Sequence, residues 1–331
     1  MSGSSRVIDL HAHAVLEAGF NQAGRYGPET GEEGGVPFFR IGEFRMKPMS
    51  YRGTPFMDVQ KRLELMDALG IDLQLLSPNP LTIFHRIEAD IAERFCRVHN
   101  DAMAELVSRY PGRFLGAAAL PMQDVDAAMR EVERAVGELG LVAAYTGTRY
   151  PFPLDDPRLD DFYRTLVALD VPLFLHPEST GGATGPDDAR LGRFDLTILL
   201  GYAYEETLAT ATLVLGGVLD RHPAVDICVS HGGGSMPYLI DHFERMGQLR
   251  GWSALHGGTF RDALRRLWFD AHTEGAAAHD MLVDTLGTER LVYGTNFGGW
   301  DTPRQVDGFA ASLSGNAERL LRLSPGATRR T

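Results

Sequence analysis

The chain has 331 residues, a formal net charge of −12, 44% hydrophobic residues and 23% charged residues. This composition is ordinary for a globular protein, and the chain is long enough to bury a core without disulfides. The acidic balance and the absence of a long basic run argue against nucleic acid as a partner. No apolar run reaches the length of a membrane span and no signal-peptide core is present, so we expect a cytoplasmic protein without membrane contact.

Short apolar runs alternate with segments of helical periodicity, which predicts parallel strands joined by crossover helices. The expected strands are Val7–Leu10, Asp72–Ser77, Phe114–Ala119, Leu141–Thr146, Pro172–Leu175, Asp226–Ser230, Leu267–Phe269 and Leu291–Gly294. The expected helices are Met57–Ala68, Ile91–Tyr110, Val125–Leu139, Leu159–Leu169, Glu205–Asp220 and His279–Leu286, with a closing helix at Ala310–Leu323. About eight such units indicate a (β/α)8 TIM barrel, an α/β fold that would occupy residues 1–331 as one domain.

Two connections are unusually long for such a barrel. Residues Ala14–Phe56 follow the first strand, and residues Glu178 to about Leu200 follow the fifth. Barrel enzymes carry their chemistry at the carboxyl ends of the strands, so we expect both loops to cover a substrate pocket. The Gly-rich stretch Glu29–Pro37 within the first connection is expected to be an exposed loop.

Histidines stand where several expected strands end. His11 and His13 follow the first strand, His176 the fifth and His231 the sixth, whereas the eighth strand leads to Asn296. Side chains two residues apart on a strand share a face, so His11 and His13 can bind one ion together. A lone pair of this kind is more often incidental, but imidazoles that collect at one edge of a barrel predict a catalytic metal site.

Five motifs, in order along the chain, carry a family resemblance: Asp9–His13, Met66–Asp72, Leu175–Pro177, Ser230–Ser235 and Tyr293–Phe297. The sequence resembles the amidohydrolase superfamily, and within it the amidohydrolase-related family typified by 2-amino-3-carboxymuconate-6-semialdehyde decarboxylase. The resemblance implies a divalent metal, with zinc as the first expectation and manganese as the other candidate. It makes His11, His13 and His176 metal ligands and His231 the acid/base residue.

Asn296 departs from the pattern of that family, in which the residue at this position is normally Asp. An amide oxygen can still bind a metal, so Asn296 stays a candidate metal ligand and catalytic residue, but it cannot carry a proton at neutral pH. Three explanations are open: an engineered Asp-to-Asn trap, a natural branch whose chemistry needs no carboxylate, and a barrel that has lost catalysis.

Candidate substrate-binding residues lie in the loops. The resemblance implies that a basic residue of the first long loop holds a substrate carboxylate, and Arg45, Lys47 and Arg52 are the candidates. A solvated loop charge is the alternative for each of them. Phe84, Tyr202 and Trp300 are placed to stack on a planar substrate, with ordinary packing as the alternative.

Two carboxylates stand beside the predicted site. Asp9 shares the strand face of His11, so it is either a hydrogen-bond partner of a ligand histidine or a polar barrel residue bonded to backbone. Asp270, at the end of the seventh strand, is a candidate for orienting His231 or a water molecule.

These residues support three hypotheses about function. The leading one is a metal-dependent decarboxylase, a C–C lyase, acting on a small aromatic or muconate-type unsaturated carboxylic acid, which makes a small anionic substrate the expected partner. The second is a metal-dependent hydrolase or hydratase acting on an amide, a lactone or a C=C bond. The third is a catalytically silent metal-binding barrel. The resemblance also implies a homodimer.

Overall fold

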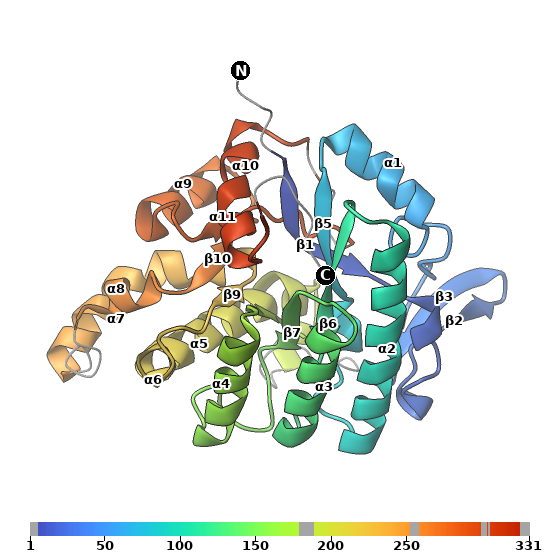
Figure 1. The fold of residues 1–331 in the computed structure, drawn as a ribbon, viewed down its shortest axis with the longest axis horizontal. Helices are drawn as coiled ribbons and strands as arrows, with labels where there is room; N and C mark the ends of the chain where they lie inside the picture. The colour runs from blue at the N-terminus through green and yellow to red at the C-terminus, as the bar shows by residue number, and fades with distance from the viewer. Residues whose placement is uncertain (1–5, 179–188, 252–257, 299–302, 304, 325–331) are drawn as a thin grey trace.

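The computed structural model describes residues 6–178, 189–251, 258–298, 303 and 305–324. Eight parallel strands are present: β1 (Ile8–Ala14), β5 (Leu73–Pro78), β6 (Phe114–Ala119), β7 (Ala143–Gly147), β8 (Leu173–His176), β9 (Ile227–Val229), β10 (Trp268–Asp270) and β11 (Leu291–Val292). They form one sheet in this order, and each overlaps a strand expected from the sequence. Helices lie between and around the strands (Figure 1), so the predicted (β/α)8 TIM barrel is confirmed.

All six expected crossover helices are found, one of them as two helices. They are α1 (Val59–Leu69), α2 (Ala89–Arg109), α3 (Val125–Gly137), α4 (Asp160–Leu169), α5 (Tyr202–Leu215), α6 (Val218–Arg221) and α9 (Ala276–Leu286). The expected helix Glu205–Asp220 is in fact α5 and α6, because Gly217 between them has a φ of +70° that interrupts the helix. The expected closing helix Ala310–Leu323 is likewise two short helices, α10 (Gly308–Ser312) and α11 (Ser314–Leu320).

Two further helices are present in the described part of the chain. Helix α7 (Met236–Arg250) and helix α8 (Phe260–Leu264) both lie between β9 and β10. Apolar side chains on the two faces of the barrel strands fall into two clusters, one shared with the crossover helices and one that includes Leu73 and Phe174 and packs against α11. Both faces of the sheet are therefore covered, as parallel strands require.

A small antiparallel sheet occupies part of the connection between β1 and α1. It consists of β2 (Glu29–Glu33), β3 (Val36–Ile41) and β4 (Phe44–Met46), and it projects from one side of the barrel (Figure 1). The expectation of an exposed loop at Glu29–Pro37 was wrong. Gly34 and Gly35 form a tight turn with positive φ angles, and the alternation of buried Phe39 and Ile41 gives β3 an apolar face.

Backbone hydrogen bonds close the barrel between β1 and the segment that follows β11. Leu10 N donates to Tyr293 O at 2.9 Å, Phe297 N donates to His11 O at 3.1 Å, and His13 N donates to Phe297 O at 2.6 Å. This seam fixes the carboxyl end of β1 against residues 293–297, which places the first and last predicted motifs side by side.

The buried carboxylate of Asp9 holds the same seam from inside. It accepts hydrogen bonds from Thr295 N at 3.0 Å, from Thr295 Oγ1 at 2.7 Å and from Gln74 Nε2 on β5 at 2.8 Å. It also accepts one from the backbone of His11 at 3.1 Å. Of the two expectations for Asp9, the structure favours the barrel residue that bonds to its neighbours, because Asp9 contacts backbone, hydroxyl and amide groups.

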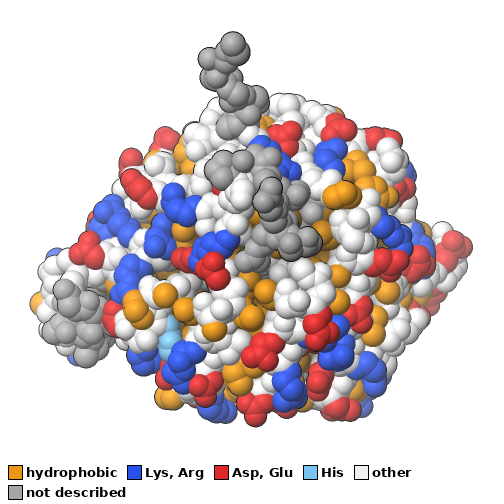
Figure 2. Space-filling view, in the orientation of Figure 1, with side chains coloured by type: hydrophobic (Ala, Val, Ile, Leu, Met, Phe, Trp, Pro, Cys, Tyr) orange, Lys and Arg blue, Asp and Glu red, His pale blue; other side chains and the backbone are white. Residues whose placement is uncertain are grey.

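The surface of the molecule carries charges of both signs. Asp and Glu side chains are interspersed with Lys and Arg over the face seen in Figure 2. Among the residues that the structure describes, no helix combines the length and the apolar character needed to cross a lipid bilayer.

Replacement of Thr295 by Val tests the barrel seam. The change keeps the shape of the side chain but removes the hydroxyl that donates to the buried Asp9, so we expect the free energy of unfolding to fall by roughly 1.5–3 kcal/mol. Chemical denaturation would measure it. Thr165→Val is the matched control, since the Thr165 hydroxyl bonds to an exposed helix carbonyl and the change should stay within about 0.5 kcal/mol. Equal effects in the two variants would contradict this role for Thr295.

Candidate metal centre

Four imidazole rings meet at the carboxyl ends of the barrel strands. His11 and His13 come from β1, His176 ends β8, and His231 follows β9. The ring centroids of His11, His13 and His176 are 4.8–5.0 Å apart. The ring centroid of His231 lies 4.8 Å from that of His11 and 5.0 Å from that of His176. The sequence spacing therefore predicted the convergence correctly, and a single ion could contact several of these rings.

The Nδ1 atoms of His11 and His176, which we call the outer nitrogens, contact strong hydrogen-bond acceptors. His11 Nδ1 lies 2.7 Å from Asp270 Oδ2, and His176 Nδ1 lies 2.7 Å from the carbonyl oxygen of Pro177. Because both partners accept, each ring carries its proton on Nδ1 and turns an unprotonated Nε2 inward. Gly294 makes room for the first pair, since a Cβ there would lie 2.6 Å from His11 Cβ. Asp270 thus orients His11 rather than His231.

The outer nitrogen of His13 is held in the same way by Ser77 at the end of β5. His13 Nδ1 lies 2.9 Å from Ser77 Oγ, and that hydroxyl donates its own hydrogen to the carbonyl of Ala12 at 3.0 Å. Ser77 must then accept from His13, which again leaves Nε2 without a proton.

The inner nitrogens fit a cation. Nε2 of His11, of His13 and of His176 is buried and has no hydrogen-bond partner within the structure. Buried polar atoms are rarely left in this state, and unprotonated nitrogens on neighbouring rings suit a divalent metal. One ring nitrogen from each of His11, His176 and His231 lies within 4.8 Å of the other two.

Burial keeps these rings neutral. It lowers the pKa of His11 to about 4, against the opposing effect of Asp270, and it lowers the pKa values of His13 and His176 well below their usual range. Neutral imidazole is the form that binds metals, so the site does not have to lose protons from these rings at neutral pH.

His231 has a different environment. Its side chain is 20% exposed, whereas the side chain of His11 is 4% exposed. Its Nδ1 lies 2.6 Å from Oε1 of Glu206, a fully buried residue of α5, and Ser230 Oγ donates to the same oxygen at 2.5 Å. Its position beside His11 and His176 is that of a candidate metal ligand as well, and the acid/base role of His231 stays a prediction.

Asn296 lies at the rim of the same space. It is buried, it lines the pocket described below, and it lies beside His13. Its φ of +52° is in the left-handed region, which Asn tolerates better than most residues. Gly298 follows with a φ of +87°, and a Cβ there would lie 2.7 Å from His13 O, so this turn can press closely against β1.

A pocket opens beside two of the imidazoles, those of His13 and His176, whereas His11 and His231 are not among its lining residues. His13, His176 and Asn296 form its floor, and its wall is largely neutral: Met46, Met49, Tyr51, Phe56, Asn79, Pro80, Leu81, Tyr202 and Gly298. Within the described ranges, no Lys or Arg belongs to this lining. The wall thus offers apolar and aromatic surface with a few neutral polar groups.

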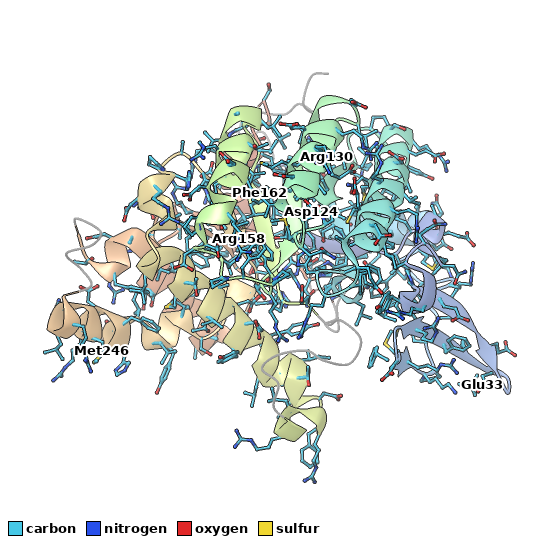
Figure 3. The ribbon with its side chains drawn as sticks, turned by 90° about the horizontal axis from the view of Figure 1, so that it is seen from below. Glu33, Asp124, Arg130, Arg158, Phe162 and Met246 are labelled. Carbon is cyan, nitrogen blue, oxygen red and sulfur yellow. The ribbon has the colours of Figure 1, made fainter. Side chains whose placement is uncertain are left out.

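The predicted basic residues are found in ion pairs on the insertion instead. Arg45 and Lys47 pair with Glu33 at 2.8 and 2.5 Å, and Arg52 pairs with Glu17 at 3.0 Å. Figure 3 shows Glu33 at the outer end of the small sheet. In this arrangement none of the three reaches the pocket lining, and a role in holding substrate stays a prediction.

The predicted aromatic residues differ in their position relative to the pocket. Phe84 is buried and packs edge-on against Phe95 of α2 with the ring centroids 4.8 Å apart, outside the pocket lining. Packing, the alternative named for it, is what the structure shows. Trp300 lies outside the described residues.

Sequence reasoning missed several residues of the site. Ser77 ends an expected strand, so the logic that found the histidines could have found it. Tyr51 lines the pocket in a left-handed conformation with a φ of +62°, a strained backbone for a bulky residue. Glu206 lies within a helix, where no pattern marks it as a neighbour of His231.

Comparison with known proteins agrees with the geometry. The model of the amidohydrolase family matches residues 8–323. The chain belongs to this family. The resemblance expected from the five motifs is therefore confirmed.

Three known proteins similar to this amidohydrolase are decarboxylases. The chain is 28% identical over 300 residues to 2-amino-3-carboxymuconate-6-semialdehyde decarboxylase of Dictyostelium discoideum, which covers 88% of this chain and 81% of the relative. It is 31% identical over 287 residues to gamma-resorcylate decarboxylase of Rhizobium radiobacter, covering 80% and 84%. It shares its fold with a Polaromonas dihydroxybenzoic acid decarboxylase solved with manganese and 2-nitroresorcinol, with a TM-score of 0.73, 24% identity, and coverage of 96% and 97%.

Metal binding by this amidohydrolase can be tested with two histidine variants. After resupply of Zn²⁺ or Mn²⁺ and desalting, we expect about one ion per chain in the natural protein and loss of that ion in His176→Ala. Excess metal should stabilise the natural protein by about 2.7 kcal/mol at a concentration one hundred times its Kd, which raises its thermal midpoint. His279→Ala on α9 should behave like the natural protein. Retention of the ion by His176→Ala would disprove the site.

Replacement of Asp270 by Asn tests the support of His11. An amide accepts more weakly than a carboxylate and can turn its NH2 group toward Nδ1, so metal affinity should fall roughly 10- to 100-fold. Competition with a chelating dye would measure it. Asp280→Asn, at an exposed carboxylate of α9, should leave the affinity unchanged. Similar affinities in the two variants would show that Asp270 does not tune the metal.

Proposed function

We propose that this protein is a metal-dependent decarboxylase, a C–C lyase, that acts on a small aromatic or muconate-type unsaturated carboxylic acid. The observation that carries the proposal is the set of three buried, unpartnered Nε2 atoms on His11, His13 and His176, next to the more exposed imidazole of His231. The decarboxylases among its relatives support the choice of reaction.

Four residues would hold the metal: His11, His13 and His176 through Nε2, and Asn296 through its amide oxygen. A divalent cation bound there, zinc or manganese, would supply positive charge that attracts the acid group of the substrate and polarises its oxygens. Neutral ligands leave that charge undiminished, because neither imidazole nor amide brings a negative charge to the ion.

His231 would supply the proton. Its Nδ1 is committed to Glu206, so Nε2 is the nitrogen that can exchange a proton with a substrate in the pocket. Protonation of the substrate carbon that bears the carboxylate forms a C–H bond. The C–C bond to the carboxylate then breaks, carbon dioxide leaves, and the bonding electrons restore the conjugated system. His231 regains its proton from water. Asn296 cannot share this work, since its amide does not ionise at neutral pH.

The pocket wall favours a planar substrate. Tyr51, Phe56 and Tyr202 offer aromatic surface, and Met46 and Met49 can adjust to the outline of a bound ring. With no Lys or Arg in the described lining, the acid group of the substrate would depend for its countercharge mainly on the cation. We also propose, from the resemblance and the acidic composition, a homodimer that has no nucleic-acid partner.

Release of carbon dioxide tests this proposal. Protein loaded with Mn²⁺ or Zn²⁺ would be incubated with 2,6-dihydroxybenzoate or 2-amino-3-carboxymuconate-6-semialdehyde, and carbon dioxide and the shortened product would be measured. We expect turnover of at least one acid, with a loss of the order of 10²- to 10⁴-fold in His231→Gln.

One variant and a second group of substrates separate the alternatives. Activity that appears only in Asn296→Asp would identify the chain as a trap or a silent barrel, and loss of activity in that variant would make Asn296 part of the native chemistry. Turnover of a lactone, an amide or a C=C bond without carbon dioxide release would replace the decarboxylase by a hydrolase or hydratase.

A further inference from the structure

The side chain of Glu206 forms a hydrogen bond with His231. Glu206 is fully buried on α5, and its Oε1 accepts from both His231 Nδ1 and Ser230 Oγ. The adjacent acidic residue, Glu205, is also buried but turns to Arg149, with 3.7 Å between the charged atoms. Two neighbouring acids of one helix therefore have different partners, Arg149 for Glu205 and His231 for Glu206.

The backbone at His231 has a left-handed conformation. His231 has a φ of +45°, and Gly232, Gly233 and Gly234 after it also have positive φ angles. Such a conformation at a residue with a large side chain costs energy and persists only where the surroundings impose it. Contacts with the rest of the fold, among them that of Nδ1 with Glu206 Oε1, hold His231 in place.

Helix α5 is placed to impose that orientation. A Cβ at Gly234 would lie 2.2 Å from the carbonyl oxygen of Ala203, so the glycine turn is packed directly against the backbone of α5. The hydroxyl of Thr207 accepts a hydrogen bond from Ser235 N at 2.8 Å, which attaches the start of α7 to the same helix. Glu206 lies between Ala203 and Thr207 in the sequence. Because both of these residues contact the segment after His231, the position of Glu206 relative to His231 is fixed.

A carboxylate that only accepts has a defined chemical effect on its histidine. It keeps a proton on Nδ1 and turns Nε2 toward the metal-site rings of His11 and His176. Two carboxylates hold site imidazoles in this way: Asp270 contacts His11 Nδ1, and Glu206 contacts His231 Nδ1.

We infer that Glu206 is the positioning residue of His231: it fixes the ring plane and the tautomer that present Nε2 to the substrate. This inference rests on the proposed decarboxylase function for its kinetic consequence. Its structural part, the tautomer of His231, does not depend on that function.

Two substitutions separate the hydrogen bond from the charge. Glu206→Leu removes both, and we expect kcat for the accepted acid to fall of the order of 10²- to 10⁴-fold, while KM and metal content stay within about twofold. Glu206→Gln keeps an acceptor of the same shape, so kcat should be partly rescued to a value between those of Glu206→Leu and the natural protein. Glu205→Gln is the matched control and should retain the natural kcat.

A spectroscopic measurement tests the tautomer directly. In protein labelled with ¹⁵N-histidine, with the signal assigned by its loss in His231→Gln, the natural chain should show His231 protonated on Nδ1. Glu206→Leu should show a mixture of tautomers, and Glu205→Gln should match the natural chain.

The outcomes divide clearly. A kcat in both Glu206 variants within threefold of the natural value, or an unchanged His231 tautomer in Glu206→Leu, would overturn the inference. Loss of metal in parallel with activity would assign Glu206 a merely structural role. If Glu206→Leu does not fold, Glu206→Gln decides, because the inference requires a lower kcat with unchanged metal content. If the natural chain releases no carbon dioxide from any acid, the proposed function fails, and the tautomer measurement still decides the role of Glu206.

Discussion

The site depends on the closure of the barrel between its first strand and the segment after its last. Hydrogen bonds between His11, His13 and Phe297 bring residues nearly three hundred positions apart into one ladder, and buried Asp9 ties Thr295 to it. Without this seam the imidazoles of β1 would not face Asn296. The contacts that complete the fold and those that assemble the site are therefore the same, as expected for chemistry at the carboxyl ends of barrel strands.

The electrostatics of the centre follow from what holds each imidazole from behind. Asp270, Ser77 and the Pro177 carbonyl accept from three outer nitrogens, which leaves three inner nitrogens neutral and unprotonated. The proposed ligands would thus bring no charge of their own to an ion, and the carboxylate of Asp270 lies one hydrogen bond further away. Such an arrangement would suit an anionic substrate, because an ion with neutral ligands keeps its full attraction for the negative charge of that substrate.

The barrel and its histidines could be predicted because both depend on local pattern: apolar runs mark the strands, and polar residues at their ends mark one rim. Features that depend on contacts between distant segments could not. Glu206 lies on a helix with no signal that points to His231, and the positions of Arg45 and Lys47 depend on Glu33 across a hairpin. The small sheet was missed because Gly34 and Gly35 resemble a loop, although the alternation at Phe39 and Ile41 was available as evidence.

Wall and floor of the pocket come from separate parts of the chain. The floor is built on strand ends of the barrel, whereas Met46, Met49 and Tyr51 belong to the small sheet and the residues just after it, which are inserted between β1 and α1. Exchange of this insertion would alter which molecules fit without disturbing the histidines below. Evolution, or a protein engineer, could therefore change selectivity and reactivity independently in this scaffold.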